Sequence, residues 1–123
     1  MDNEPKTLDP SLVLNAYKIG IFPMADNKLS KKIHWVKPEF RGILPLNSVH
    51  VPKSLKKKIK KNPFVIKFDT SFNDVINACS KINTKRDNTW INKNIILSYN
   101  KLFEMGYAHS VEAWKNNKLV GGL

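Results

Sequence analysis

The sequence predicts a mixed fold of the α/β (α+β) class, in which helices and short strands follow one another along the chain. Apolar side chains recur at helical spacing over residues 72–82 and 95–103. Residues 64–68 are rich in strand formers, and residues 108–114 alternate in polarity. A chain of 123 residues, 41% hydrophobic and 25% charged, suffices for one domain with a modest core, or for a small lobe and part of a second domain.

The charge and the cysteine content restrict the partners and the compartment. A formal net charge of +11 predicts a polyanionic partner, namely RNA, DNA or anionic lipid. Cys79 is the single cysteine, so no intrachain disulfide can form and a reducing compartment is favoured. No run approaches the ~20 apolar residues of a membrane span, and the polar start lacks the apolar core of a signal peptide. We therefore expect a cytoplasmic protein.

The first helix is predicted to follow a loose start over residues 1–8. Asp9 fits the N-cap and Pro10 the first helical position. An apolar face runs along residues 12–19, and Gly20 is placed to end the helix in a left-handed conformation.

The next two segments, residues 20–26 and 33–42, combine turn formers with large apolar and aromatic side chains. Neither has the period of a helix or the alternation of a clean strand. Glycine and proline at this density beside aromatics predict a rigid pair of loops that shapes a surface. A turn-rich connector over a small core is the alternative. Residues 43–46 are apolar and contain a proline, which predicts an edge or irregular segment.

A strongly basic helix is predicted over residues 52–61, with a proline in its first turn and an Asn-Pro pair after its end. At 3.6 residues per turn, five lysines share one face: Lys53, Lys56, Lys57, Lys60 and Lys61. Leu55 and Ile59 lie opposite, where they can dock the helix on the core. A solvated face is the usual explanation of such a run, but no acidic residue occurs between residues 51 and 67, which favours contact with RNA.

A further helix is predicted to start at Ser71, which forms a capping-box pattern with Asp74. Its apolar stripe runs from residue 72 to Ile82 and includes Cys79. No histidine or other base is near this cysteine in sequence, so we predict a core residue and not a nucleophile.

Asn92 is placed to cap the next helix, whose stripe over residues 95–103 ends before Gly106. Trp90 precedes this helix and Tyr99 lies about two turns into it. Both side chains suit a core, and their polar tips also suit the wall of a half-open pocket.

The last part of the chain is predicted to form a hairpin, with a turn at Asn116-Asn117 and a return strand over residues 118–123. Because a sheet is expected to continue beyond this strand, we expect the 123 residues alone to be inactive. The three histidines, His34, His50 and His109, are far apart in sequence and are predicted to be surface or structural residues. Without clustered His and Cys, no metal site is predicted.

Several short motifs together resemble the bacterial leucyl/phenylalanyl-tRNA–protein transferases. In order they are Gly-Ile-Phe-Pro-Met-Ala-Asp at 20–26, Trp35 with Pro38 and Arg41-Gly42, Thr89-Trp90-Ile91, Gly-Tyr-Ala-His-Ser-Val-Glu at 106–112 and Leu-Val-Gly-Gly at 119–122. Each motif is weak alone, and five in order are strong. The resemblance runs from about Leu14 to the last residue and covers only the N-terminal part of such an enzyme. Lys37 and Phe40 depart from the family pattern, which affects the path of that loop.

The resemblance implies an aminoacyltransferase without a cofactor. Such enzymes move leucine or phenylalanine from charged tRNA to the N-terminal arginine or lysine of a protein, which marks that protein for N-end-rule degradation. A small N-terminal α/β lobe, residues 1–42, would precede the first part of an N-acetyltransferase-like (GNAT-like) mixed-sheet domain, residues 43–123. A monomer is favoured.

The resemblance also implies site residues. Met24, Trp90 and Tyr99 would line the pocket for the aminoacyl-adenosine end of the tRNA, and the five lysines named above would bind its phosphates. The catalytic groups are expected beyond Leu123. Two alternatives remain: a non-catalytic RNA-binding module, supported by the charge, and an acetyl-CoA-dependent N-acetyltransferase, whose glycine-rich pyrophosphate loop is absent from the sequence.

Overall fold

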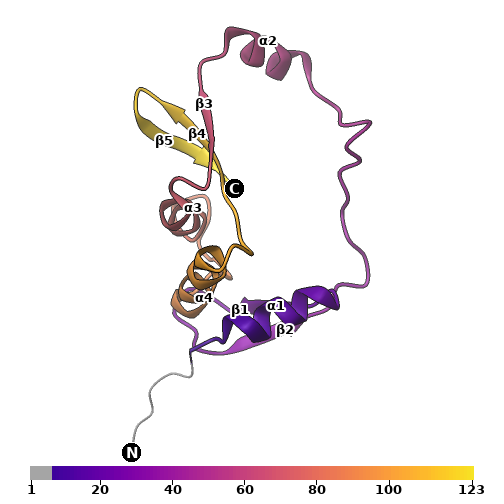
Figure 1. Ribbon diagram of the computed structural model, residues 1–123, viewed down its shortest axis with the longest axis vertical. Helices are drawn as coiled ribbons and strands as arrows, with labels where there is room; N and C mark the ends of the chain where they lie inside the picture. The colour runs from indigo at the N-terminus through magenta and orange to yellow at the C-terminus, as the bar shows by residue number, and fades with distance from the viewer. Residues whose placement is uncertain (1–6) are drawn as a thin grey trace, which may run out of the picture.

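The computed structural model describes residues 7–123 and shows a mixed fold with two small antiparallel sheets (Figure 1). The helices are α1 (Pro10–Lys18), α2 (Lys53–Lys61), α3 (Phe72–Cys79) and α4 (Lys93–Glu104). The strands are β1 (Phe22–Ala25), β2 (Ile33–Val36), β3 (Val65–Phe68), β4 (Val111–Lys115) and β5 (Lys118–Gly122). The predicted α+β class is confirmed at this level. None of the helices formed by residues 7–123 is long and apolar enough to cross a membrane.

Helix α1 begins and ends as its sequence predicts. The Asp9 side chain accepts a hydrogen bond from the backbone N–H of Ser11 at 2.9 Å, and Pro10 is the first helical residue. Gly20 follows the helix with φ +79°, a conformation in which a side chain would be strained.

The two segments predicted to be loops contain paired strands instead. Strand β1 pairs antiparallel with β2, with Phe22 opposite Val36 and Ala25 opposite Ile33. The prediction was wrong because Pro23, which argues against a central strand, is tolerated in a two-stranded sheet, where each strand has a free edge. The unpaired side of β1 faces the loop before α4, and the Ala25 N–H donates to the Trp90 carbonyl at 3.0 Å.

The core lies where α4 packs against α1, α3 and β1. Its central cluster is Ala25, Phe72, Ile76, Ile91 and Ile95. The rings of Phe72 and Phe103 stack with their centroids 4.7 Å apart, which joins α3 to α4. The apolar stripe predicted for α4 therefore does face the core.

Helix α3 differs from its prediction at both ends. It ends at Cys79, so Ile82 lies beyond it and is 43% exposed. Ser71 is the N-cap, but its hydroxyl bonds the Asp74 carboxylate at 3.1 Å and makes no bond to the helix backbone. Cys79 packs against the core cluster, as predicted.

The second sheet has the order β3-β4-β5, with Phe68 opposite Val111 and a bulge at Ala113/Trp114. Asn116 and Asn117 adopt φ angles of 51° and 59°. Positive φ at both central residues is the property of a type I′ turn, which joins antiparallel strands tightly. The predicted hairpin is confirmed.

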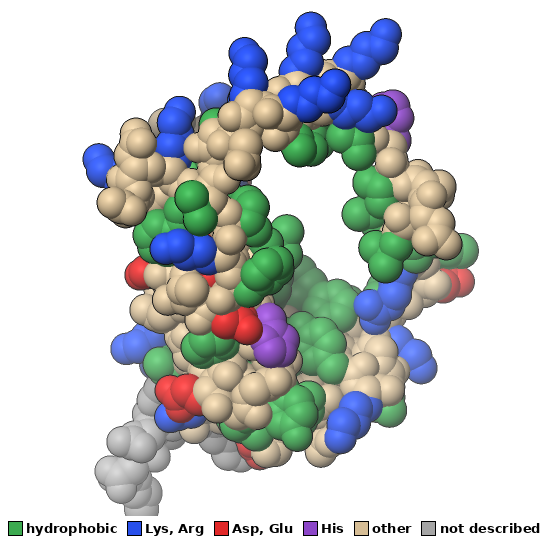
Figure 2. Space-filling model, turned by 45° about the horizontal axis from the view of Figure 1, so that its top comes forward, with side chains coloured by type: hydrophobic (Ala, Val, Ile, Leu, Met, Phe, Trp, Pro, Cys, Tyr) green, Lys and Arg blue, Asp and Glu red, His purple; other side chains and the backbone are tan. Residues whose placement is uncertain are grey.

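Helix α2 stands at the far end of the molecule from α1, reached by an extended segment over residues 37–52 that includes the irregular stretch predicted at 43–46 (Figure 1). The prediction that α2 docks on the core was wrong. No residue of α2 is buried, and Leu55 and Ile59 are 46% and 61% exposed. These two side chains line a small hollow together with Pro63 and Ile66. They contact none of the core cluster formed within residues 7–123, and this is why they remain exposed. Figure 2 shows an opening bordered by hydrophobic side chains.

Candidate functional site

The five predicted lysines form one exposed surface on α2, which we call the lysine face. Figure 2 shows Lys and Arg side chains gathered there. Among the ion pairs found between residues 7–123, none involves α2. The helix ends at Lys61, and Asn62 follows as its C-cap in a left-handed conformation, with its N–H donating to the Ile59 carbonyl. Helix α2 thus presents several positive charges on one exposed face without an acidic neighbour in sequence, a pattern that suits a polyanion.

Tyr99, on α4, meets Tyr17 of α1. Their hydroxyls are hydrogen-bonded, and the rings meet edge to face with centroids 6.3 Å apart. Burial, followed by the bond to Tyr17, raises the pKa of the Tyr99 hydroxyl above its usual value. Both tyrosines line a cavity of about 400 Å³, which we call the tyrosine cavity, together with Leu14, Phe72, Tyr107 and His109. Sequence reasoning identified Tyr99 but missed Tyr17, which belongs to the face of another helix.

Trp90 and Met24, the other two predicted pocket residues, do not line the tyrosine cavity. Trp90 is half-buried and packs against the same core cluster as Tyr99. In β1 the buried residues alternate with half-buried ones, so Met24 lies on the opposite face from Ala25. The structure therefore brings Trp90 and Tyr99 to one cluster and leaves Met24 on the outer face of β1.

His109 lines the tyrosine cavity and pairs with Asp69, where the sequence predicted only a surface or structural histidine. Asp69 follows β3 and has φ +58°, while His109 precedes β4. Asp69 Oδ2 lies 2.8 Å from His109 Nδ1, and its Oδ1 accepts from the Ser110 N–H at 2.8 Å. The bond with His109, and then that with Ser110, lower the pKa of Asp69. The partners are forty residues apart, so no local pattern could have revealed the pair.

Glu112, on β4, is completely buried next to this pair. It accepts hydrogen bonds from the Thr70 N–H at 2.9 Å and from the Ser110 hydroxyl at 3.0 Å. Burial acts to raise the pKa of Glu112, but these hydrogen bonds outweigh it and lower the pKa from 4.5 to about 2. The carboxylate therefore stays ionised and holds the start of α3 to β4.

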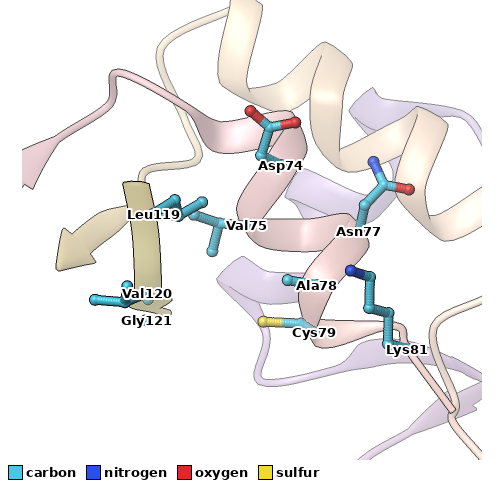
Figure 3. A pocket seen from close by; sticks show the side chains of 10 residues that line it. Asp74, Val75, Asn77, Ala78, Cys79, Lys81, Leu119, Val120 and Gly121 are labelled. Atoms are coloured by element: carbon cyan, nitrogen blue, oxygen red, sulfur yellow. The ribbon is translucent and has the colours of Figure 1, made fainter. Parts of the chain in front are cut away.

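A larger hollow, of about 500 Å³, lies between α3 and β5 (Figure 3). Asp74, Asn77 and Lys81 contribute its polar side, and residues 119–122 of β5 contribute the other. None of the predicted site residues lines it. Its polar groups include no paired acid and base, so its geometry indicates no chemistry.

The comparison with known families decides the relationship. The family model described as leucyl/phenylalanyl-tRNA protein transferase matches residues 43–123. The chain belongs to this family. The model of the N-terminal domain of the leucyl/phenylalanyl-tRNA protein transferases matches residues 6–39. The resemblance carried by the five motifs is thereby confirmed.

One curated relative of this transferase family is the leucyl/phenylalanyl-tRNA–protein transferase of Paramagnetospirillum magneticum (strain ATCC 700264 / AMB-1). It is 47% identical over 118 residues, which are 96% of this chain and 56% of the relative. The chain thus spans a little over half the length of that transferase. The division at residues 1–42 and 43–123, and the N-acetyltransferase-like character of the second part, stay predictions.

Proposed function

We propose that this protein, at the length of its transferase relatives, moves leucine or phenylalanine from charged tRNA to the N-terminal arginine or lysine of an acceptor protein. The acceptor would thereby be marked for N-end-rule degradation in the cytoplasm, where charged tRNA is made and used. The family match over residues 6–39 and 43–123 carries this proposal. The structure supports it with the lysine face at one end of the molecule and the tyrosine cavity at the other.

The chemistry needs little beyond positioning. The aminoacyl ester of tRNA is already activated, so an enzyme that holds the amine against the ester gains most of the rate. Residues 7–123 supply binding surfaces for the ester end, and we propose that the groups that orient the acceptor amine lie beyond Leu123.

Tyr99 and Trp90, which meet in one cluster, are proposed to hold the aminoacyl-adenosine end, and Met24, on the other face of β1 from Ala25, stays a prediction from the family resemblance. Tyr99 has the cavity beside it, and Trp90 packs against the same core cluster. Aromatic rings can stack the terminal adenine and can enclose an apolar side chain. An apolar pocket separates side chains by only about 1–3 kcal/mol per methylene. Acceptance of leucine, phenylalanine and methionine is therefore expected.

The lysine face is proposed to hold the tRNA backbone. Its charges lie on α2, which has no buried residue and stands at the opposite end of the molecule from α1 and α4 (Figure 1). Phosphate contacts position a nucleic acid without reading its sequence. Such a surface suits an enzyme that accepts several tRNAs and distinguishes them by the attached amino acid.

A transfer assay tests this function. The family-length protein is given radiolabelled leucyl- or phenylalanyl-tRNA and peptides that begin with arginine, lysine or alanine. We expect label only on the first two peptides and on neither after acetylation of their N-termini. Binding of tRNA without transfer would support the RNA-binding module, and labelling from acetyl-CoA would support an acetyltransferase.

A further inference from the structure

The orientation of the His109 ring is fixed by its surroundings. The Asp69 carboxylate that contacts Nδ1 is itself held by the Ser110 N–H, and the Asp69 N–H donates to the Ser110 carbonyl at 3.1 Å. Asp69 itself has φ +58°, in the left-handed region that aspartate tolerates better than most residues. An ionised carboxylate can only accept, so Nδ1 carries the hydrogen, and in the neutral form of the ring Nε2 presents a lone pair.

That lone pair is available to a ligand. The His109 side chain is 65% exposed and lines the tyrosine cavity. None of the hydrogen bonds found within residues 7–123 uses its Nε2. Among the described residues, Asp69 is the charged group that His109 contacts. The nearby Glu112 carboxylate is buried and already bonded to Thr70 and Ser110. The rim of an aromatic cavity thus carries one oriented hydrogen-bond acceptor.

The end of a charged tRNA offers a matching donor. Tyr17, Tyr99 and Tyr107 provide aromatic surface on which a base can stack. When an aminoacyl group is esterified to the 3′ oxygen, the free 2′-hydroxyl lies between the base and the ester. An acceptor at the rim of the aromatic wall is therefore placed for this hydroxyl, which also distinguishes RNA from DNA.

We propose that His109 Nε2 accepts a hydrogen bond from the 2′-hydroxyl of the terminal ribose, and that Asp69 is the positioning residue that fixes the ring. The assignment rests on the proposed function, since it names the part of the charged tRNA that meets this cavity. It adds a polar contact for the ribose to the aromatic pocket.

The test is a double-mutant cycle in the family-length protein. Wild type and His109→Phe are compared on leucyl-tRNA that ends in adenosine and on leucyl-tRNA that ends in 2′-deoxyadenosine. For wild type we expect kcat/KM to fall roughly three- to tenfold without the 2′-hydroxyl, the value of one neutral hydrogen bond. His109→Phe should lose as much on the normal tRNA and nothing more on the deoxy tRNA. Any change in ester reactivity is common to both proteins and cancels.

Equal losses in both proteins, which would mean that the two effects are independent, would overturn the assignment.

A second measurement tests the contact without transfer, so it still applies if His109→Phe does not fold or if the wild-type protein does not transfer. The ¹⁵N resonances of His109 are recorded with 3′-leucylamido-adenosine and with its 2′-deoxy form. A shift of Nε2 with the first compound only supports the proposal, and identical spectra reject it. Failure of transfer alone rejects only the proposed function. Asp69→Asn should raise KM more than it changes kcat, because it loosens the ring without removing it.

Discussion

The guanidinium of Arg41 donates from Nη2 to the backbone carbonyl of Gly20 at 2.6 Å, across a separation of 21 residues. Its carbon Cζ lies 5.8 Å from the centre of the Phe22 ring, within the range of a cation–π contact. One side chain thus ties the segment that leads to α2 back to the end of α1 and the start of β1. Arg41 and Gly20 belong to two different motifs of the five, and this hydrogen bond joins those two motifs in the structure.

Replacing Arg41 tests this tie. Arg41→Ala removes a charge-assisted hydrogen bond and the contact with the Phe22 ring, and we expect a loss of about 1 kcal/mol of stability in an exposed setting. Arg41→Lys should recover only part of it, because lysine lacks the planar fork. The control is Lys37→Ala, another exposed cation of the same segment. Midpoints of urea unfolding measure the difference, and equal midpoints for Arg41→Ala and Lys37→Ala would contradict the prediction.

Gly20 itself gives a second prediction. Its φ of +79° lies in the left-handed region, where an alanine is disfavoured by roughly 1–2 kcal/mol. Gly20→Ala should therefore lower the free energy of unfolding by about 1 kcal/mol. Gly42→Ala is the matched control, because no atom beyond the adjoining residues lies within 4 Å of the added Cβ and its φ is not positive. A Gly20→Ala protein as stable as Gly42→Ala would show that the turn relaxes.

Local chemistry made some elements predictable. Asp9 and Asn92 both accept the backbone hydrogen bonds expected of helix caps, and Asn116 with Asn117 forms the expected turn. In each case the decisive interaction spans only a few residues, so the sequence contains it. The stripe of α4 was predictable for the same reason, since helical spacing alone places Ile95 and Leu102 on one face.

Contacts between distant segments were not predictable from patterns. Strand β1 contains Pro23, which counts against a strand until its partner β2 and its free edge are known. Helix α2 has the pattern of a docked helix, yet Leu55 and Ile59 remain exposed. Asp69 and His109 meet through the pairing of β3 with β4. Such meetings depend on topology, and the sequence motifs indicated the family without indicating these contacts.

The lysine face should act as a phosphate clamp. Changing Lys56, Lys57 and Lys60 together to Ala should weaken binding of every tRNA about equally. The slope of log K against log[salt] should shrink by roughly 2–3, because about one counterion is retained per lost phosphate contact. Filter binding between low and moderate salt measures the slope in the family-length protein.

The control for the lysine face removes the same charge elsewhere. Lys28, Lys31 and Lys32 lie exposed in the loop between β1 and β2. Changing these three to Ala should leave the salt slope nearly unchanged. If both triple variants flatten the slope equally, net charge and not the lysine face determines binding, and the α2 lysines are a solvated surface.

Glu112 should make stability depend on pH in the acid range. Its pKa is lowered from 4.5 to about 2 in the folded protein. The folded state therefore binds its proton less readily than the unfolded state, so its contribution is complete above pH 4.5 and is lost as the pH falls toward 2. Glu112→Gln should be less stable at pH 7, since its amide meets the N–H and hydroxyl donors of Thr70. The melting temperature of Glu112→Gln should also fall less between pH 5 and pH 3 than that of wild type, measured by circular dichroism. Parallel curves would show that Glu112 is not the titrating group.

Replacing Trp90 should impair aminoacyl transfer without weakening the binding of the tRNA backbone to the lysine face. Its side chain is half-buried, and its carbonyl accepts from Ala25, so the backbone position survives substitution. If the indole stacks part of the aminoacyl-adenosine end, Trp90→Ala should lower kcat/KM for leucyl and phenylalanyl transfer roughly ten- to a hundredfold, because stacking on one base contributes about 1–3 kcal/mol. The affinity for tRNA that lacks its terminal adenosine should stay within about twofold, because phosphate contacts dominate it.

Two further variants decide between pocket and core. Trp90→Phe keeps an aromatic face and should retain most transfer. Trp35→Ala removes another indole, 40% exposed on β2, and should leave transfer near wild type. A buried aromatic that is only structural costs about 3–5 kcal/mol when truncated to alanine. Unfolding of Trp90→Ala by circular dichroism, with Trp90→Phe folded and fully active, would therefore identify Trp90 as a core residue. A folded Trp90→Ala protein with intact tRNA binding and little transfer would assign its indole to the aminoacyl pocket.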